Sequence, residues 1–456
     1  MKSTNVYISD IIDSQRIDVA YFSNSIGEKD YAALSKYVTI KGGKRIPKGR
    51  TFSSEQTDYL YLRLSEISDF ERIDFEVFKC IDEDLFDILK RYEIHNNQIV
   101  FSIAGTIGKV FVLKDIPNGK RVILTENCAM IQPKDGSILP DYISILLNSN
   151  VVQKQIGQNR VQTTIPKIGL DRIAKLKVPK VPPIAVQQKI VEIYSQAQQT
   201  RLDKLQEAKE LLNSIDDYLL EALKIDKKQQ RKEEHRRIQK NVSSIIGSRF
   251  DVSFHKGIEN IIEEIKKIPN KTLGEISEFS SDSWDQKSLF EDRFPYIEIS
   301  SIDTTTGEII NVENIPLSNP PSRAKKIVQK NDILVSMTRP NRGAICIYNG
   351  NNISIASTGF SIIRRVKDCV LKEYLHVVLR SSVSLKQMEL RSSGGNYPAI
   401  IESELKRIII PIPPLSIQQM IVDKICVIKN KSKQLQKEGD ALLEETKQKI
   451  EKMIIG

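Results

Sequence analysis

The sequence is poor in the residues that build disulfide frameworks, metal centres and membrane spans. Its 456 residues include five cysteines, scattered without a C-x-x-C pair, and four histidines that do not cluster with them. This spacing argues against a disulfide framework and a zinc site, and it fits a reducing cytosol. No apolar run approaches the length that crosses a bilayer, and the opening MKSTNVYISD has no apolar signal core. We therefore expect a cytoplasmic protein without a membrane partner.

Acidic residues are the minority charge. The chain has 68 Lys and Arg against 58 Asp and Glu, a net charge of +10, which favours an anionic partner. Residues 224–240 alone carry eight basic and three acidic residues. Half of the excess therefore lies in one short stretch, and such a stretch is more often a solvated helix end than a phosphate-binding surface.

The chain contains the same pattern twice. Residues 181–191 read VPPIAVQQKIV and residues 412–422 read IPPLSIQQMIV, and each stretch is followed by a long charged segment. A period of about half the chain indicates a duplicated unit rather than a solenoid of short repeats. Four further pairs keep nearly the same order and separation: QRIDVAYFS with SRFDVSFHK, YLRLSEI with YIEISSI, NNQIVFSIAG with KNDILVSMTR, and DYISILLNS with EYLHVVLRS.

Each copy is predicted to be a mixed α/β unit followed by a long helix. Strand-like runs such as YLYLRL, QIVFSIAG and KVFVL alternate with polar loops, and residues 140–156 have a helical pattern. Three prolines in residues 176–183 predict an extended connector before the first long helix. We place the domain boundaries at 1–180, 181–241, 242–411 and 412–456.

The two long helices have narrow apolar stripes. The first is expected from Val186 to about Leu223, or as far as Lys240, with a polar gap at residues 200–204. The second follows the proline frame, and Ser416 has the spacing of a capping box at its start. Each stripe is most simply buried against the other helix, as in a coiled-coil seam. The alternative is that each helix packs on its own globular unit.

This arrangement resembles the specificity subunit of type I restriction-modification systems. The resemblance rests on the recurring proline-glutamine frame after two α/β units, and it covers essentially the whole chain. The segment YVTIKGGKRIPKG is also similar to the start of a target-recognition domain of that family. The implied fold class is α/β (α+β), with two similar target-recognition domains, each followed by a long helix. The resemblance further implies that the two helices pair as an antiparallel coiled coil with pseudo-two-fold symmetry.

The resemblance also implies a function. Each target-recognition domain would read one half of an asymmetric, bipartite site on double-stranded DNA, and the helices would set the spacing. Two methyltransferase (modification) subunits and motor-nuclease (restriction) subunits would be the protein partners. This chain would then be no enzyme and would hold no cofactor, because S-adenosylmethionine, ATP and Mg²⁺ belong to the partners. The alternatives are a DNA methyltransferase or nuclease with its own recognition domains, and a coiled-coil scaffold without a DNA role.

Candidate DNA-binding residues lie in polar loops. Arg and Lys suit guanine, Asn and Gln suit adenine, and basic or hydroxyl side chains suit phosphate. An ordinary solvated loop is the alternative at each place. In the first unit the candidates are Lys41, Lys44, Arg45, Lys48, Arg50, Asn159, Arg160, Gln162 and Thr163. In the second unit they are Lys287, Arg339, Asn341, Arg342, Arg391, Asn396 and Tyr397.

Motifs that suggest catalysis are incomplete. Residues 319–322 read NPPS, and serine stands where a base-stacking aromatic residue is needed in an amino-methyltransferase. Residues 105–109 read GTIGK, which lacks the spacing of a phosphate-binding loop. We therefore predict no catalytic and no metal-binding residue. Trp284 is expected to pack in the core or a loop.

Overall fold

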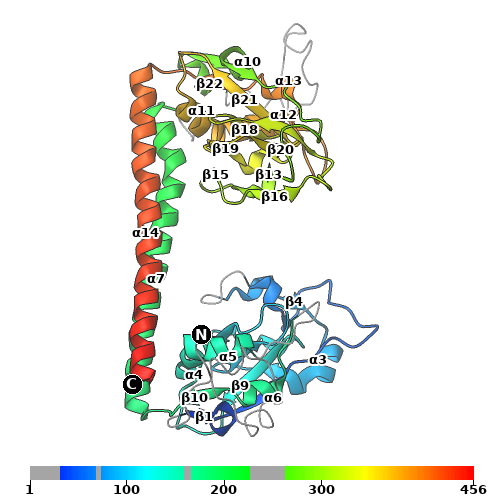
Figure 1. The fold of residues 1–456 in the computed structure, drawn as a ribbon, viewed down its shortest axis with the longest axis vertical. Coiled ribbons are helices and arrows are strands. Elements are labelled where there is room, and N and C mark those ends of the chain that lie inside the picture. The colour runs from blue at the N-terminus through cyan, green and yellow to red at the C-terminus, as the bar shows by residue number, and fades with distance from the viewer. Residues whose placement is uncertain (1–30, 68–72, 159–165, 226–261, 456) are drawn as a thin grey trace. The chain divides into compact units, whose positions relative to one another are not determined.

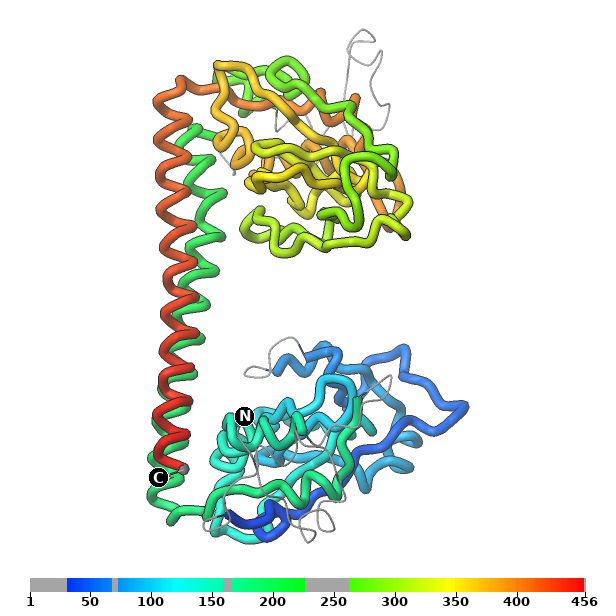
Figure 2. The backbone as a smooth tube through the Cα atoms, viewed as in Figure 1, coloured from blue at the N-terminus to red at the C-terminus, as the bar shows by residue number. Residues whose placement is uncertain are grey.

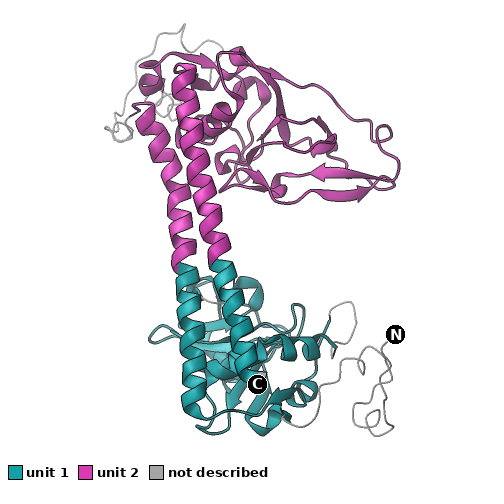
Figure 3. Ribbon diagram, turned by 60° about the vertical axis from the view of Figure 1, so that its left-hand side comes forward, with its two compact units in different colours: residues 1–202, 439–456 teal, residues 203–438 magenta. Residues whose placement is uncertain are grey.

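The chain forms two compact units, which are described separately. The computed structural model describes residues 31–67, 73–158, 166–225 and 262–455. Unit 1 comprises residues 1–202 together with 439–456, and unit 2 comprises residues 203–438 (Figure 3). The helices α7 (Ile184–Ala222) and α14 (Leu415–Ile455) each contribute residues to both units.

Two four-stranded sheets form the centre of unit 1 (Figure 1). Their strand orders are β2-β9-β6-β7 and β4-β3-β8-β5, and β3 pairs with β8 in parallel, whereas the other neighbours are antiparallel. The strands are β1 (Tyr31–Ala33), β2 (Val38–Gly42), β3 (Tyr59–Leu62), β4 (Lys79–Cys80), β5 (Glu93–Ile94), β6 (Ile99–Ser102), β7 (Val110–Val112), β8 (Arg121–Leu124), β9 (Cys128–Pro133) and β10 (Lys177–Pro179). The helices are η2 (Leu34–Lys36), η3 (Leu64–Glu66), η4 (Phe75–Val77), α3 (Glu83–Leu89), η5 (Lys90–Tyr92), α4 (Pro140–Leu147), α5 (Asn150–Gln158) and α6 (Leu170–Ala174).

Unit 2 repeats this plan. Its sheets have the orders β12-β21-β18-β19 and β16-β13-β20-β17, and again one pair, β13 with β20, is parallel. The strands are β11 (Asn270–Thr272), β12 (Ser277–Phe279), β13 (Arg293–Ile297), β14 (Ile302–Asp303), β15 (Glu308–Ile309), β16 (Glu313–Pro316), β17 (Ala324–Val328), β18 (Ile333–Ser336), β19 (Ile345–Ile347), β20 (Ser354–Ser357), β21 (Phe360–Val366) and β22 (Ile409–Pro411). The helices are α10 (Leu273–Ile276), η7 (Ile299–Ser301), η8 (Pro340–Arg342), α11 (Lys372–Leu379), α12 (Ser382–Arg391) and α13 (Glu402–Leu405).

Successive side chains of the central strands point to opposite faces, so each unit has two core layers, one on each face of the strand. In β6, Ile99 and Phe101 pack against helices α4 to α6, and Val100 faces the second sheet of the unit. The corresponding residues of β18 are divided in the same way in unit 2. Side chains of a strand point alternately to its two faces, so a strand covered on both faces is apolar throughout. The predicted duplication of an α/β unit is confirmed.

One detail of the expected secondary structure differs. The segment 140–156 forms two helices, α4 and α5, because the chain breaks at Asn148, whose side-chain amide donates to the carbonyls of Val110 and Ser144. Trp284 is confirmed as a core residue. It is 2% exposed, and its ring lies 4.6 Å from that of Phe294.

A buried glutamine opens the long helix of unit 1. The side-chain oxygen of Gln187 accepts a hydrogen bond from the amide of Leu139 at 2.9 Å. Its nitrogen donates to the carbonyls of Ser137 and Pro182 at 2.9 and 2.8 Å. Leu139 is the N-cap residue of α4. This one side chain therefore fixes the start of α7 against the start of α4.

Unit 2 repeats the same three hydrogen bonds. Gln418 accepts from the amide of Leu371, the N-cap residue of α11, and donates to the carbonyls of Cys369 and Pro413. Both glutamines are fully buried. The predicted capping box at Ser416 is wrong: Ser416 lies inside α14, and the carbonyl of Pro414 accepts the first amides of the helix.

The two long helices pair in antiparallel fashion within each unit (Figure 2). In unit 2, Lys204 forms an ion pair with Glu438 at 2.6 Å, and the hydroxyl of Ser432 donates to the carbonyl of Ala208. Lys204 thus lies beside Glu438, and Ala208, further along α7, lies beside Ser432, which is earlier in α14. The two helices therefore run in opposite directions. The expected pairing is confirmed. Both helices also contribute side chains to the unit cores, so packing on the globular units accompanies the pairing and does not replace it.

Ion pairs fill the polar gap in the apolar stripe of α7. In unit 1, Arg201 pairs with Asp440 at 2.8 Å. Gly439 lies against Arg201, and a Cβ atom on this glycine would be 3.3 Å from the Cγ atom of Arg201. The missing side chain therefore allows the two helices to approach closely where charged residues replace the apolar stripe.

The helix α7 ends at Ala222, well before Lys240. The amides of Lys224 and Ile225 donate to the carbonyls of Glu221 and Leu220, and Lys224 has φ +57°. These hydrogen bonds form a Schellman motif, in which a left-handed residue terminates the helix. Ile225 is buried with Leu220 in the core of unit 2. The expected end near Leu223 is therefore confirmed, and the longer extent to Lys240 is wrong because α7 terminates at Ala222.

We predict that Gln187→Ala lowers the free energy of unfolding by about 2–4 kcal/mol, because one amide and two carbonyls lose a buried partner. Gln188→Ala is the matched control, since this neighbour in the same motif is exposed. Urea denaturation followed by circular dichroism measures both. Equal stability of the two variants would show that the buried hydrogen bonds contribute nothing net.

Candidate nucleic-acid interface

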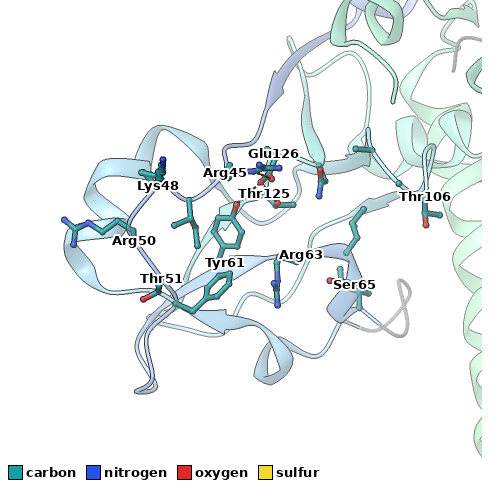
Figure 4. Close-up of a pocket in the computed structure, with 18 of the residues that line it drawn as sticks. Arg45, Lys48, Arg50, Thr51, Tyr61, Arg63, Ser65, Thr106, Thr125 and Glu126 are labelled. Atoms are coloured by element: carbon teal, nitrogen blue, oxygen red, sulfur yellow. Dashed lines mark hydrogen bonds and ion pairs between the residues drawn. The ribbon is translucent and has the colours of Figure 1, made fainter. Parts of the chain in front are cut away.

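An open cleft of about 1000 Å³ lies in unit 1 (Figure 4). Its walls come from four parts of the chain: residues 45–52 after β2, residues 61–67 in and after β3, residues 104–109 between β6 and β7, and residues 125–127 between β8 and β9. The sheet order therefore brings distant segments together at strand ends, where loops are free to vary without disturbing the core.

The lining is strongly basic. Five of its side chains are cationic, and Glu126 carries the one negative charge among them. A concave surface lined by one sign of charge concentrates counter-ions, and basic side chains contact phosphate oxygens in nucleic-acid complexes. The cationic residues are Arg45, Lys48, Arg50, Arg63 and Lys109.

A hydrogen-bond network holds the loop after β2 against the cleft wall. Arg45 pairs with Glu126 at 2.6 Å, and the hydroxyl of Tyr61 contacts the same carboxylate and donates to the carbonyl of Lys44. Burial raises the pKa of Tyr61 to about 12, so the hydroxyl stays neutral. Burial alone would raise the pKa of Glu126, but hydrogen bonds, chiefly from Arg45, hold it below its ordinary value. The carboxylate is therefore ionised and largely neutralises Arg45.

A close backbone approach and an aromatic pair complete the cleft. A Cβ atom on Gly43 would lie 2.1 Å from the carbonyl oxygen of Thr125, so only glycine lets the loop pass there. The rings of Phe52 and Tyr61 are 5.8 Å apart, and the guanidinium of Arg63 lies 4.8 Å from the Phe52 ring. Arg63 is also paired with Glu66.

In unit 2, two loops are joined by backbone hydrogen bonds. The amide of Arg339 donates to the carbonyl of Pro398 at 2.7 Å, and the amide of Ile400 donates to that of Met337 at 2.9 Å. The guanidinium of Arg339 lies 4.1 Å from the ring centroid of Tyr397, which is 70% exposed. The loop between β18 and β19 and the loop after α12 thus present one surface.

A family model for the "Type I restriction modification DNA specificity domain" matches residues 33–213 and 265–445. These ranges cover more than half of the chain. The chain belongs to this family. Its two matches fall on the two copies that the sequence repeat predicted, one covering most of the described part of each unit.

Individual relatives match over shorter stretches. The chain is 28% identical over 136 residues to the HindI specificity subunit of Haemophilus influenzae, which is 29% of this chain and 30% of that protein. It is 27% identical over 130 residues to the EcoBI specificity subunit of Escherichia coli, which is 28% of this chain and 26% of that protein. The match therefore spans under a third of the length of either curated relative.

Solved structures of the same family cover nearly the whole chain at low identity. The type I S subunit from M. genitalium has a TM-score of 0.41 and 16% identity, with 94% of this chain and 98% of that chain covered. The HsdS subunit from Thermoanaerobacter tengcongensis has a TM-score of 0.36 and 15% identity, with 93% and 96% covered.

The structure distributes the candidate residues of the first specificity domain unevenly. Arg45, Lys48 and Arg50 line the cleft, Lys44 adjoins it, and Lys41 lies on β2 outside the lining. Asn159, Arg160, Gln162 and Thr163 lie outside the described residues, and their role stays a prediction.

Three basic or amide residues of the lining are not among the sequence candidates: Arg63, Lys109 and Asn127. Arg63 directly follows β3, in a segment interpreted as a strand, and Lys109 ends the GTIGK motif that was dismissed as an incomplete phosphate-binding loop. Their neighbourhood in the cleft depends on sheet order, which no local pattern reveals.

The second specificity domain brings five of its candidates to the joined loops: Arg339, Asn341, Arg342, Asn396 and Tyr397. The side chain of Arg391 is largely buried and pairs with Glu404 of α13 at 2.9 Å, so its contact is structural. Lys287 is exposed in a turn that the Asp285 carboxylate closes through hydrogen bonds, beside Trp284.

Among residues 31–67, 73–158, 166–225 and 262–455, no cluster of three or more His, Cys, Asp or Glu could hold a metal ion. Within the same ranges, every helix is too short or too polar to cross a membrane.

We predict that the double change Lys48→Ala and Arg50→Ala weakens DNA binding without regard to sequence. If both contact phosphate, the slope of log K against log salt should fall in magnitude by about 2, since each contact releases about 0.9 counter-ion. The measurement is fluorescence anisotropy at several salt concentrations. Lys90→Ala is the control, because Lys90 pairs with Asp87 outside the cleft. An unchanged slope would exclude the two residues as phosphate contacts.

Proposed function

We propose that this chain recognises an asymmetric, bipartite site on double-stranded DNA, with one specificity domain for each half. The observation that carries the proposal is the double family match, which covers most of the described residues of unit 1 and of unit 2. A duplicated reader is suited to a target with two separate sequence elements, because each copy can bind one element.

The contrast between scaffold and loops supports two different half-sites. The sheet orders, the parallel strand pair and the buried glutamine recur in both units. The loops do not recur: unit 1 has a basic cleft, and unit 2 has an arginine stacked on an exposed tyrosine. Different donors and acceptors fit different base edges, so the two half-sites should differ in sequence.

We further propose that two modification subunits and the motor-nuclease subunits supply the chemistry, together with S-adenosylmethionine, ATP and Mg²⁺. The modification subunits would dock on the long helices, and the length of these helices would fix the length of the unread spacer. In support, α14 exposes Met420 and Val427, which are 47% and 62% exposed and one heptad apart. Because DNA is the target, we place the complex in the bacterial cytoplasm.

The experiment that tests the proposal is mapping of methylated adenines in the host genome with and without this gene. Loss of one two-part methylated motif on deletion is the expected result. An unchanged methylation pattern in a strain that expresses the modification subunit would contradict the proposal. Binding of S-adenosylmethionine by the isolated chain, measured by calorimetry, would instead favour a methyltransferase with its own recognition domains.

We predict that Met420→Glu combined with Val427→Glu prevents co-purification with the modification subunit, because two charges replace exposed apolar contacts on α14. Thermal unfolding of the chain alone should change little, since both side chains lie outside the core. Ile401→Glu is the control: this residue is 63% exposed in the same unit but precedes α13. Full co-purification of the double variant would exclude this face as the docking surface.

A further inference from the structure

Arg339 occupies a backbone conformation that the other copy gives to glycine. Its φ and ψ are +48° and +52°, in the left-handed region where a Cβ atom is unfavourable. In the paired segments NNQIVFSIAG and KNDILVSMTR, the residue that corresponds to Arg339 is Gly105, with φ +74°. Unit 2 thus keeps a strained arginine where glycine would fit without strain. Such strain concentrates at functional positions.

The backbone around Arg339 is held on two sides. Its amide donates to Pro398, and Thr338 forms a β-bridge with Ala399. The loop after α12 is itself closed by reciprocal hydrogen bonds between Ser393 and Ala399, at 2.9 and 2.8 Å. The Cα atom of Arg339 is therefore fixed by two loops that brace each other.

The guanidinium of Arg339 is held by hydrogen bonds along one edge and by an aromatic ring against one face. Its Nε and Nη2 atoms donate to the carbonyl of Asn396 at 3.3 and 2.9 Å, and its face lies over the Tyr397 ring. The remaining edge, formed by Nη1 and the second hydrogen of Nη2, has no hydrogen-bond or carboxylate partner among the described residues. Arg339 therefore keeps two parallel N–H donors in a fixed orientation, and its positive charge is not compensated.

Two acceptors in DNA match such a pair of donors. A guanine presents O6 and N7 on its major-groove edge, and a phosphate presents two oxygens. A phosphate can be contacted by a point charge such as a flexible lysine, which needs no fixed orientation. At Arg339, by contrast, the backbone conformation, the hydrogen bonds to the Asn396 carbonyl and the stacking on Tyr397 all fix the orientation of the guanidinium. These features favour the base edge over the phosphate.

We infer that Arg339 is a specificity-determining residue that binds the O6 and N7 atoms of one guanine in the half-site of unit 2. This inference rests on the proposed function, because it assumes that unit 2 contacts DNA. It adds to that function the identity of one recognised base and the residue that recognises it.

The test uses the chain assembled with its modification subunit and a panel of duplexes in which each base pair of the bipartite site is changed in turn. Three variants are compared with the wild type. Arg339→Gly copies Gly105 and relieves the backbone, and Arg339→Lys keeps the charge but removes the fork. Lys224→Gly is the control, because it also removes an exposed cation at a left-handed position of unit 2.

Both Arg339 variants should lose discrimination at one G·C pair of the half-site read by unit 2. The expected loss is roughly 5- to 150-fold, which corresponds to about 1–3 kcal/mol at 1.4 kcal/mol per tenfold. Discrimination at the other half-site should persist. Lys224→Gly should behave as the wild type, and thermal unfolding should show that all variants are folded.

Two results would overturn the inference while leaving the proposed function intact. The first is wild-type discrimination at every position in both Arg339 variants. The second is a uniform loss of affinity in Arg339→Gly, with a smaller salt dependence and rescue by Arg339→Lys, which identifies a phosphate contact. If the wild-type complex itself prefers no bipartite site, the proposed function fails, and this inference fails with it.

Discussion

The apolar seam between α7 and α14 is the interaction on which both units depend. In unit 1, Ile190 of α7 and Ile450 of α14 share one core. In unit 2, Leu219 of α7 packs in one core with Ile421 and Ile425 of α14. Each unit is therefore completed by helical turns from a remote part of the sequence. The core of unit 1 includes Ile450 of α14, which is far along the sequence from the other members, and closing so long a loop costs entropy.

The buried glutamines convert this seam into a fixed geometry within each unit. An apolar stripe alone specifies that two helices touch, but it leaves the direction of each helix loosely defined. The side chains of Gln187 and Gln418 satisfy buried backbone groups of the neighbouring helix and the proline connector. A shift of α7 or α14 would leave those groups without partners, which is costly in a dry interior. The glutamines therefore hold each long helix in place on its unit.

Comparison of the two copies distinguishes residues that maintain the fold from loop residues that are free to differ with the target. Positions that carry packing recur, such as the tyrosines Tyr142 and Tyr374, both fully buried. Positions at the loop ends differ, and Gly105 against Arg339 is the sharpest case because the backbone is left-handed in both. The two copies thus act as an internal comparison within one chain, in which a shared conformation with a different side chain marks a candidate for recognition.

The sequence predicts the duplication, the α/β class and the pairing of the helices, because these depend on periodicity and on repeated motifs. It predicts an end of α7 near Leu223, but it does not exclude a longer helix, and it does not predict the break between α4 and α5. Those features depend on hydrogen bonds from Asn148 and on the burial of Ile225. The basic cleft is only partly predictable: Arg45, Lys48 and Arg50 share one loop, whereas Arg63 and Lys109 join them through the order of the strands. The strain at Arg339 is invisible until backbone angles are known.

The most direct measurement of the central claim is a unit exchange. Residues 270–411, from β11 to β22, would be replaced by residues 31–179, the equivalent segment from β1 to β10, and the methylated sites of the assembled complex would be mapped. If each unit reads its own half-site, the new site contains the half-sequence of unit 1 twice. Methylation of the original two-part site by a folded, assembled exchange variant would contradict the account.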